Sequence, residues 1–351
     1  MRKTLGILAL IITCALISIN TWAKDNAVIL LYHHVSDSSP KVTSVSPETF
    51  REHMQYLADH HQVLPLKEVI ETLQNKKPLP DKAVVITFDD GYENIYENAH
   101  PILKEFSFPY TIFINPPLIG NVSYQLDWQQ VKTMANEGGS FANHGSQHTH
   151  MLTRSNNESE ESWLQRNLQE IEIAETILKQ NLGYSLKYFA YPYGEFDSKL
   201  KARLSSKGYI SFAQHSGAIA SHSDFSALPR YPSAGIYSNI KSLMVKLNSL
   251  AMPVDNVYPN DPKIELPSYD QGLSFNVKSE DLRPQQINCF QNGQALNKSL
   301  EGNTVSVYMS PITKPGRHRV NCTAPSISEK GRFYWFSQPF FMPTADGKWL
   351  D

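Results

Sequence analysis

Short apolar runs alternate with amphipathic stretches from about residue 27 to residue 213. The apolar runs are rich in Val, Ile, Phe and Ala, which is typical of strands buried on both faces of a parallel sheet. The intervening stretches repeat apolar residues every three to four positions, as helices do when one face packs on a sheet. The alternation predicts repeated strand–helix units and therefore an α/β fold. We expect its parallel sheet to curl into a barrel, with functional loops at the carboxyl ends of the strands.

The individual elements can be placed from this pattern. The predicted strands are Ala27–Leu31, Ala83–Phe88, Tyr110–Ile114, Ser140–Ala142, Tyr188–Ala190 and Tyr209–Ala213. The predicted helices are one that begins at Ser46 and Pro47, then Tyr92–Phe106, Asp127–Asn136, Glu160–Leu182 and Ser198–Lys207. Serine before proline is typical of a helix start, and Gly183 is a typical stop after the longest helix.

The pattern changes after about residue 254. A stretch that contains Pro259, Pro262 and Pro267 resembles a linker, and apolar residues then alternate with polar ones without a helical period. The chain is therefore expected to hold a distorted (β/α) barrel domain at 24–250 and a small all-β sandwich domain at 251–351. The aromatic run at 332–336 either presents rings to a sugar or fills the sandwich core, and an alternating strand of this kind favours the core.

The first 23 residues have the layout of a secretory signal peptide. Arg2 and Lys3 precede an apolar run, Leu5–Ile19, and small residues end the segment at Ala23. The run is shorter than the roughly 20 residues that a membrane-spanning helix needs, so we expect no stable membrane anchor. A retained anchor is the alternative, and a lipoprotein is disfavoured because no lipobox precedes Cys14. The protein is expected to be secreted or periplasmic, with association with the cell envelope left open.

Cysteine content and net charge give further predictions, about a disulfide and about the class of binding partner. After removal of the signal the cysteines are Cys289 and Cys322, and in an exported protein such a pair predicts one disulfide. Two buried free thiols are the alternative. The formal net charge of −2 gives no reason to expect nucleic acid as a partner.

Candidate chemistry begins at Asp89 and Asp90, which end the predicted strand 83–88 and precede Gly91. Adjacent carboxylates at a strand end are unfavourable unless a cation or a catalytic role offsets their repulsion. Consecutive residues leaving a strand point to opposite sides, so one aspartate can bind a metal while its neighbour faces a substrate. A calcium-binding or turn-forming Asp-Asp-Gly is the alternative.

A histidine pair, His144 and His148, follows the strand predicted at 140–142. At this spacing the two imidazoles share one face of a helical turn and can offer two nitrogens to one ion. A metal ion bound by two histidines and one carboxylate keeps open coordination positions for water and a substrate carbonyl. A solvated His-rich surface loop is the alternative, and the nearby aspartate pair favours the metal site. His150 is expected to face elsewhere.

Segments 87–91 and 144–148 resemble the first two motifs of the polysaccharide deacetylases, the NodB-homology group or carbohydrate esterase family 4. The resemblance spans about residues 27–235. It implies that Asp89 is the general base, and that Asp90, His144 and His148 bind a divalent metal, most simply Zn²⁺. Gly145 departs from the family's Ser or Thr after the first histidine.

The resemblance extends to a third motif, with Tyr193 matching the residue whose backbone N–H helps to hold the oxyanion. The family's arginine, which supports the base, is replaced by Ala190, and Arg230 is a candidate substitute. The late motifs that carry the acid histidine are not evident. The sequence at 32–35, Tyr-His-His-Val, instead resembles the start of exported poly-β-1,6-N-acetylglucosamine deacetylases, which implies that His33 is the acid. A structural histidine at this strand end is the alternative, and His34 is expected to be structural.

These features predict a secreted, metal-dependent hydrolase that removes N-acetyl groups from an N-acetylglucosamine-type polysaccharide. Poly-β-1,6-N-acetylglucosamine is favoured over chitin or peptidoglycan. One alternative is a non-catalytic glycan-binding or matrix-scaffold protein with a degenerate barrel, which Ala190 and the missing late motifs favour. Another is the same fold acting on small cyclic amides or lipid-linked sugars, which the signal peptide and the appended β domain disfavour.

Overall fold

The computed structural model describes residues 24–265 and 267–350 of the chain. The predicted signal peptide at residues 1–23 lies outside this range. Among the described residues, no helix is both long enough and apolar enough to cross a lipid bilayer.

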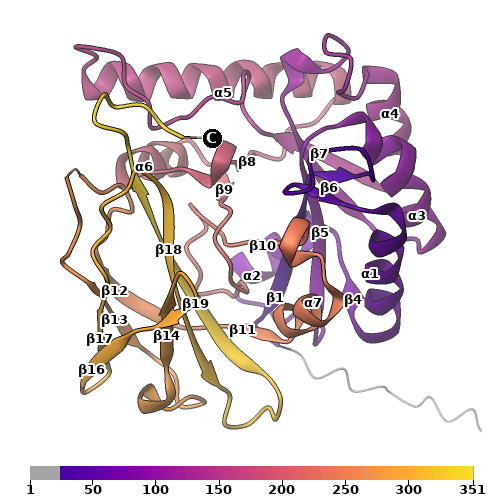
Figure 1. Ribbon diagram of the computed structural model, residues 1–351. Coiled ribbons are helices and arrows are strands. Elements are labelled where there is room, and N and C mark those ends of the chain that lie inside the picture. Colours follow the sequence, from indigo (N-terminus) through magenta and orange to yellow (C-terminus); the bar gives the residue numbers. More distant parts are fainter. Residues whose placement is uncertain (1–23, 266, 351) are drawn as a thin grey trace, which may run out of the picture.

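The larger part of the molecule is built on a parallel sheet whose strand order is β10-β1-β5-β6-β7-β8-β9, with β4 pairing with β5. The strands are β1 (Ala27–Tyr32), β4 (Gln62–Val63), β5 (Ala83–Asp90), β6 (Tyr110–Ile114), β7 (Gly139–Asn143), β8 (Tyr188–Ala190), β9 (Ile210–Phe212) and β10 (Tyr231–Pro232). This sheet curls into the distorted barrel that the sequence predicted, and we call residues 24–248 the barrel (Figure 1). Because every pairing is parallel, all carboxyl ends meet at one edge. A short parallel pair, β2 (His34–Val35) and β3 (Ser44–Val45), lies beyond β1 at that edge.

Helices pack around this sheet, and α5 is the longest of them (Figure 1). They are α1 (Pro47–His60), α2 (Leu66–Gln74), α3 (His100–Glu105), α4 (Trp128–Asn136), α5 (Glu160–Leu182), α6 (Ser198–Ser206) and α7 (Ile240–Leu247). Alternate residues of β1 and β5 face opposite ways: Leu30 and Ile86 pack with α1, α3 and α4, whereas Ile29 and Val85 pack inside the barrel with α2. The same alternation places Asp89 inside the barrel.

The helix predicted at 92–106 differs from expectation at its start. A π-helical turn, Ile95–Ala99, precedes α3, and the His100 N–H bonds to the Ile95 carbonyl. Pro101 has no N–H to donate to the preceding turn, which favours this wider register. The predicted starts at Ser46 and Asp127 are confirmed, since each side chain accepts a hydrogen bond from the first turn of its helix. Helices α2 and α7 were not predicted.

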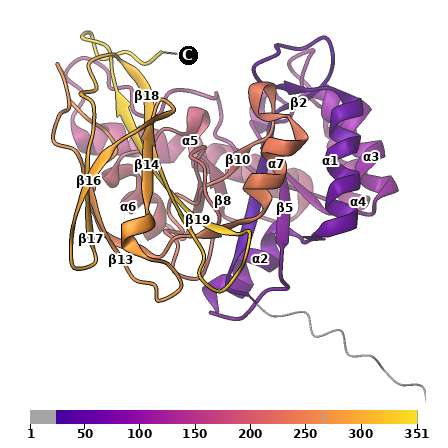
Figure 2. The same ribbon diagram turned by 60° about the horizontal axis from the view of Figure 1, so that its bottom comes forward.

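In the second part of the chain the described residues, 249–265 and 267–350, form the strands β11 to β19, and we call this part the β domain (Figure 2). One sheet has the order β11-β19-β18-β14-β15, the other β12-β13-β17-β16, and their apolar faces enclose a common core. The strands are β11 (Ser249–Ala251), β12 (Val254–Tyr258), β13 (Leu273–Val277), β14 (Asn288–Gln291), β15 (Gln294–Ala295), β16 (Asn297–Glu301), β17 (Thr304–Tyr308), β18 (Gly316–Pro325) and β19 (Phe333–Met342). The expected sandwich is confirmed.

Three details of the β domain bear on the sequence predictions. Cys289 and Cys322 face each other across β14 and β18 and form the expected disulfide. Residues Val254–Tyr258, which directly precede the proline-containing stretch, form β12 and pair with β13. In the aromatic run, Phe336 packs against Phe275 of the sandwich core, which supports the core interpretation.

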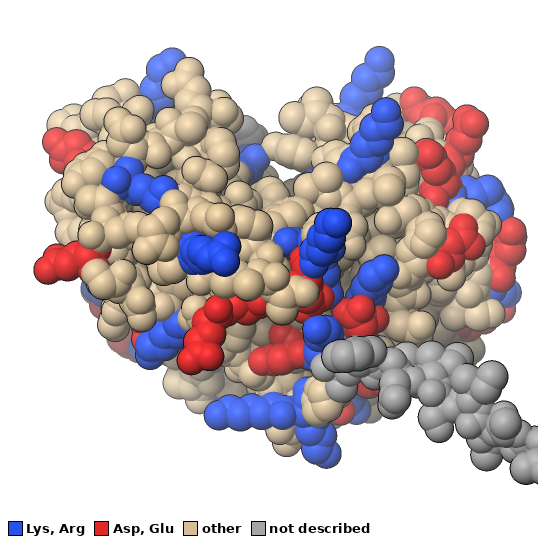
Figure 3. All heavy atoms as spheres, turned by 90° about the horizontal axis from the view of Figure 1, so that it is seen from below, with Lys and Arg blue, Asp and Glu red and all other residues tan. Residues whose placement is uncertain are grey.

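The barrel and the β domain are in direct contact. Strand β11 runs parallel to β19, the Asn26 side chain accepts a hydrogen bond from the Ala251 N–H, and Trp335 packs edge-on against Tyr231. Because β11 already belongs to a β-domain sheet, the domain division at residue 250 stays a prediction. Seen from below, the surface is hollowed between the two lobes (Figure 3).

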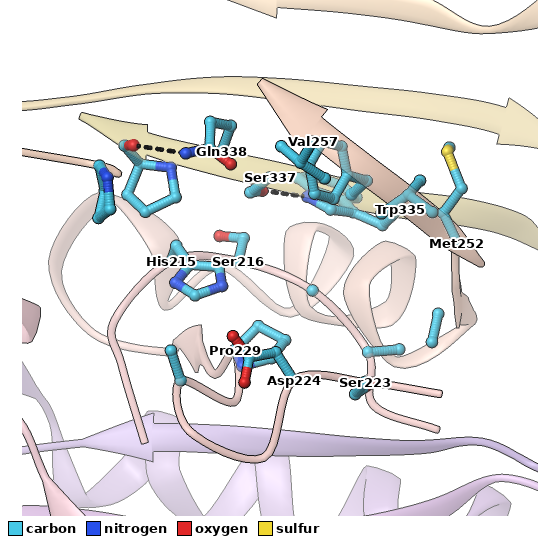
Figure 4. A pocket seen from close by; sticks show the side chains of 18 of the residues that line it. His215, Ser216, Ser223, Asp224, Pro229, Met252, Val257, Trp335, Ser337 and Gln338 are labelled. Atoms are coloured by element: carbon cyan, nitrogen blue, oxygen red, sulfur yellow. Dashed lines mark hydrogen bonds between the residues drawn. The ribbon is translucent and has the colours of Figure 1, made fainter. Parts of the chain in front are cut away.

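A cavity of about 340 Å³ also lies at this junction. His215, Ser216 and Asp224 line it from the barrel side, and Trp335 and Ser337 line it from β19 (Figure 4). None of the residues that the sequence predicted to be functional lines this cavity. The candidate site lies elsewhere, at the carboxyl edge of the sheet.

Candidate metal and catalytic centre

The residues predicted to be functional come from the carboxyl ends of four strands of the same sheet, β1, β5, β7 and β8. Asp89 and Asp90 are the last two residues of β5, and His33 directly follows β1. His144 directly follows β7, and Tyr193 lies in the short turn after β8. The carboxyl ends of adjacent parallel strands meet, so side chains distant in the sequence share one edge of the sheet.

Asp90, His144 and His148 form a compact cluster. Asp90 Oδ1 lies 3.3 Å from Nε2 of His144 and 3.3 Å from Nε2 of His148. One ligand atom from each residue falls within 4.8 Å of the other two, which is close enough for all three to hold one ion. The Asp90 backbone has a left-handed φ of 72°, which turns the chain out of β5 at this residue.

The donor atoms of this cluster fit a divalent metal. Among the described residues, Asp90 Oδ1 and His144 Nε2 are buried yet make no hydrogen bond, a costly arrangement unless a cation completes it. His144 Nδ1 lies 2.8 Å from the Ala190 carbonyl. A carbonyl can only accept, so Nδ1 carries the proton and Nε2 presents its lone pair to the cluster. Two imidazole nitrogens and one carboxylate oxygen are a set that zinc prefers, with room for further ligands.

The loop that carries the histidines is not a helical turn, contrary to the reasoning from their spacing. It is irregular, with left-handed φ values of 80° at Gly145 and 50° at His148. Asn115 Nδ2 donates to the carbonyls of His144 and Gly145, and Asn143 Oδ1 accepts from the Gly145 N–H. These bonds satisfy the loop backbone in place of a helix. The two imidazole rings still meet, with centroids 4.9 Å apart.

Asp89 points into the barrel and pairs with Arg230, which directly precedes β10. The guanidinium donates from Nη1 to Oδ1 and from Nη2 to Oδ2, both at 2.7 Å. Neither side chain is exposed to solvent. Burial by itself raises the pKa of Asp89, but the charge of Arg230 and the hydrogen bonds that it donates hold the pKa below its usual value.

The two histidines after β1 have different surroundings. His33 is half-buried. It directly follows β1, whose last residue pairs with Phe88 of β5, so His33 lies at the same edge of the sheet as Asp89 and Asp90. His34 is buried, stacks on Tyr92 at 3.7 Å and receives a hydrogen bond from Asn94. Burial lowers the pKa of His34 to about 4, which keeps it neutral.

Tyr193 lies in the turn after β8 with a left-handed φ of 58°, an uncommon conformation for a residue with a bulky side chain. Its ring stacks on His150 with a centroid separation of 3.9 Å and an interplanar angle of 10°, and it contacts His148 at 4.6 Å. His150 therefore faces Tyr193, apart from the Asp–His–His cluster as its spacing predicted. Tyr193, with its strained backbone, therefore packs directly against the candidate metal ligand His148.

The chain is similar in sequence to known proteins of one family. A sequence model of the family described as polysaccharide deacetylase matches residues 76–212. The chain is 30% identical over 234 residues to the poly-β-1,6-N-acetyl-D-glucosamine N-deacetylase of Staphylococcus aureus, a match that covers 60% of this chain and 79% of that protein. The chain belongs to the polysaccharide deacetylase family.

Other relatives are matched over a smaller share of their length. The poly-β-1,6-N-acetyl-D-glucosamine N-deacetylase of Escherichia coli is 24% identical over 254 residues, covering 62% of this chain and 38% of that protein. The YxkH protein of Bacillus subtilis is 38% identical over 136 residues, covering 38% of this chain and 47% of that protein. The chain thus spans less than half the length of these two relatives.

Solved structures of similar fold agree with the barrel. The deacetylase PplD of Streptococcus pyogenes in complex with acetate has a TM-score of 0.57 and 23% identity, over 63% of this chain and 98% of that one. IcaB of Ammonifex degensii has a TM-score of 0.56 and 23% identity, over 64% of this chain and 98% of that one. At this identity the likeness shows the fold, which is a NodB-type barrel.

This polysaccharide deacetylase family member has site residues that the sequence reasoning missed. Tyr92 stacks on His34, and the turn after β8 contains Glu195, a fully buried carboxylate. Glu195 follows the Pro-Tyr-Gly turn directly, but nothing in the sequence marks it as buried. Its cationic partner, Arg317, comes from the β domain. Such a contact is between distant parts of the chain and leaves no local signal.

Proposed function

We propose that the protein is an exported, metal-dependent polysaccharide N-deacetylase that hydrolyses acetamido groups of an N-acetylglucosamine-type polymer. The observation that carries this proposal is the pairing of a metal-competent cluster, Asp90–His144–His148, with a buried ionised carboxylate, Asp89, from the adjacent position on β5. Family membership supports the reaction class. The relatives named as poly-β-1,6-N-acetyl-D-glucosamine N-deacetylases favour that polymer over chitin or peptidoglycan.

Each residue has a role that its chemistry permits. A divalent ion held by Asp90, His144 and His148, most simply zinc, would polarise the acetamide carbonyl and lower the pKa of an attacking water. Asp89, kept ionised by Arg230, accepts the proton of that water as general base. The Tyr193 backbone N–H is assigned to the oxyanion that develops at the carbonyl oxygen. His33 donates a proton to the departing sugar amine, which leaves poorly without it.

The alternative, a non-catalytic scaffold with a degenerate barrel, drew on the missing arginine at Ala190. Arg230 weakens the case for this alternative. From the position before β10 it donates two hydrogen bonds to Asp89, as the family's arginine would be expected to support the base. We also propose that residues 1–23 direct export, that the protein acts outside the cytoplasm in the periplasm or beyond, and that residues 24–250 and 251–351 are the two domains.

Acetate release tests this function directly. The purified protein is incubated with poly-β-1,6-N-acetylglucosamine, chitin oligomers and peptidoglycan, alongside the Asp89→Asn variant. We expect release from the first polymer and a rate at least about 10²-fold lower for the variant, a typical size for general-base catalysis. Binding of a polymer without any release of acetate would instead establish the scaffold alternative.

A further inference from the structure

Glu195 is a carboxylate in an unusual place. It lies two residues after Tyr193, in the turn that follows β8, and its side chain has no exposed surface. A buried ionised carboxylate is strongly unfavourable unless cationic donors satisfy it. His150 Nδ1 lies 2.9 Å from Glu195 Oε2, which accounts for one oxygen from within the barrel.

The other oxygen of Glu195 is bound by the β domain. Arg317, the second residue of β18, donates from Nη1 to Glu195 Oε1 at 3.1 Å, across 122 positions of sequence. The same nitrogen also donates to the Leu350 carbonyl. The Arg317 side chain is about one-third exposed, at 34%, so it lies at the edge of the contact while Glu195 is inside it.

Arg317 also covers the residue assigned to the oxyanion. Its guanidinium carbon lies 5.4 Å from the centre of the Tyr193 ring, within the range of a cation–π contact. The Tyr193 ring is thus contacted by His150, by the candidate metal ligand His148 and by Arg317. A tyrosine keeps a left-handed backbone conformation only where the surrounding residues hold it in place. One of the residues that contact Tyr193, Arg317, belongs to the β domain.

Strand β18 carries a second arginine that makes a parallel contact elsewhere. Arg319 lies two residues further along the strand, on the same face, and Nη2 donates to the Tyr237 hydroxyl at 2.7 Å. Tyr237 ends the short helical turn after β10, a different loop at the carboxyl edge of the barrel. Among the described residues, Arg319 makes no ion pair with a carboxylate, so it offers a matched control from the same strand and face.

We infer that Arg317 is a positioning residue through which the β domain completes the catalytic face. By binding the buried Glu195 and covering Tyr193, it fixes segment 191–196 in the conformation that places the Tyr193 backbone beside the metal ligands. The β domain is then part of the catalytic unit, in addition to any role it has in binding a polymer. The kinetic part of this inference rests on the proposed function, and the structural part does not.

The test compares Arg317→Ala, Arg317→Lys and Arg319→Ala in the full chain. Hydrogen–deuterium exchange, read by mass spectrometry, should show amides of segment 191–196 exchanging about tenfold faster in Arg317→Ala, because a local contact that restrains opening is lost. Exchange there should be unchanged in Arg319→Ala. Arg317→Lys keeps a charge for Glu195 but lacks the planar group over Tyr193, so its effect should be intermediate.

Kinetics provide the second measurement. In Arg317→Ala, kcat should fall by about 10–100-fold, the cost of a small misplacement at a reacting centre, with little change in KM. The double variant Glu195→Gln with Arg317→Ala should lose no more kcat than Arg317→Ala alone, because the two residues act as a unit.

Three results would overturn the inference. The first is unchanged exchange in segment 191–196 of Arg317→Ala. The second is a rise in KM with kcat preserved in Arg317→Ala, which would indicate that Arg317 contacts the substrate directly. The third is a loss of kcat in Arg319→Ala equal to that in Arg317→Ala. If the wild-type protein releases no acetate from any polymer, the proposed function fails, and the exchange measurement alone then decides whether Arg317 fixes the segment.

Discussion

Arg230 binds both carboxylate oxygens of Asp89 at 2.7 Å, and both side chains are completely buried. The arginine precedes β10, whereas Asp89 ends β5, and β1 lies between these strands in the sheet. The ion pair therefore spans the width of β1. Its arginine comes from a part of the chain far from Ala190, which occupies the position of the family's arginine. An ion pair of this geometry fixes both the orientation and the charge of the carboxylate.

Replacing Arg230 should affect stability as well as rate. In Arg230→Ala the Asp89 carboxylate stays buried without its cation, so we expect unfolding to become easier by about 3–5 kcal/mol. Denaturant titration measures this change, and acetate release should fall with it. Arg230→Ala combined with Asp89→Asn removes both charges and should recover part of the stability but none of the activity. A double variant no more stable than Arg230→Ala would argue against the charge explanation.

His33 and His34 should respond oppositely to substitution. His33→Ala removes the proposed acid and should lower kcat/KM by on the order of 10²-fold with the metal still bound. His34→Ala removes a stacked ring and the partner of Asn94, so it should lower the melting temperature more than the rate. Near-normal activity in His33→Ala with full metal content would place the acid at another residue.

Metal removal should abolish activity reversibly. The cluster offers three protein ligands, and His148 is its most exposed member, which gives a chelator access to the ion. Elemental analysis should find one divalent ion per chain before chelation, and added Zn²⁺ should restore acetate release afterwards. His148→Ala should weaken metal retention while leaving the barrel folded. A metal-free sample with full activity would refute the assignment of Asp90, His144 and His148.

The Cys289–Cys322 bond should stabilise the β domain by about 3–4 kcal/mol, since it closes a loop of 33 positions across two paired strands. The double Cys→Ser variant should unfold at correspondingly lower denaturant concentration. Thiol titration of the unfolded, unreduced protein should find neither cysteine reactive, and two reactive thiols would show that the bond does not form.

The pH dependence of stability should report His53, a buried residue of α1. Its Nε2 lies 2.7 Å from the Ser238 carbonyl and its Nδ1 lies 3.0 Å from the Tyr32 hydroxyl, an arrangement that suits the neutral ring. Burial lowers the pKa of His53 to about 4 from its ordinary value of 6.5. The unfolded chain therefore binds a proton at a higher pH than the folded one.

The unfolding free energy should accordingly fall as the pH drops from about 6.5 to about 4, by on the order of 3 kcal/mol from this residue. Above about pH 6.5 the contribution is constant. His53→Gln should flatten the decline, whereas His60→Gln, on the exposed face of the same helix, should leave it intact. An unaltered slope in His53→Gln would show that other groups dominate acid destabilisation.

The alternating barrel, the all-β second part and most residues of the candidate site could be predicted from local patterns in the sequence. Strand identity follows from runs such as Ala83–Phe88, because a strand buried on both faces has to be apolar throughout. The aspartate pair and His144 were predictable since they follow directly from strand ends, and parallel strands bring their carboxyl ends together. Helix starts at Ser46 and Asp127 were equally local, since a cap is made by a side chain within its own turn.

Contacts between segments that are far apart in the sequence could be seen only in the folded structure. The His144–His148 loop is irregular because Asn115 and Asn143 satisfy its backbone, which their positions in the sequence do not reveal. Arg230 was a candidate for the missing arginine, but its pairing depends on how β10 lies beside β1. Arg317 could not be predicted at all, because it lies 122 positions from Glu195 in the sequence and the two residues meet only where the β domain packs against the barrel.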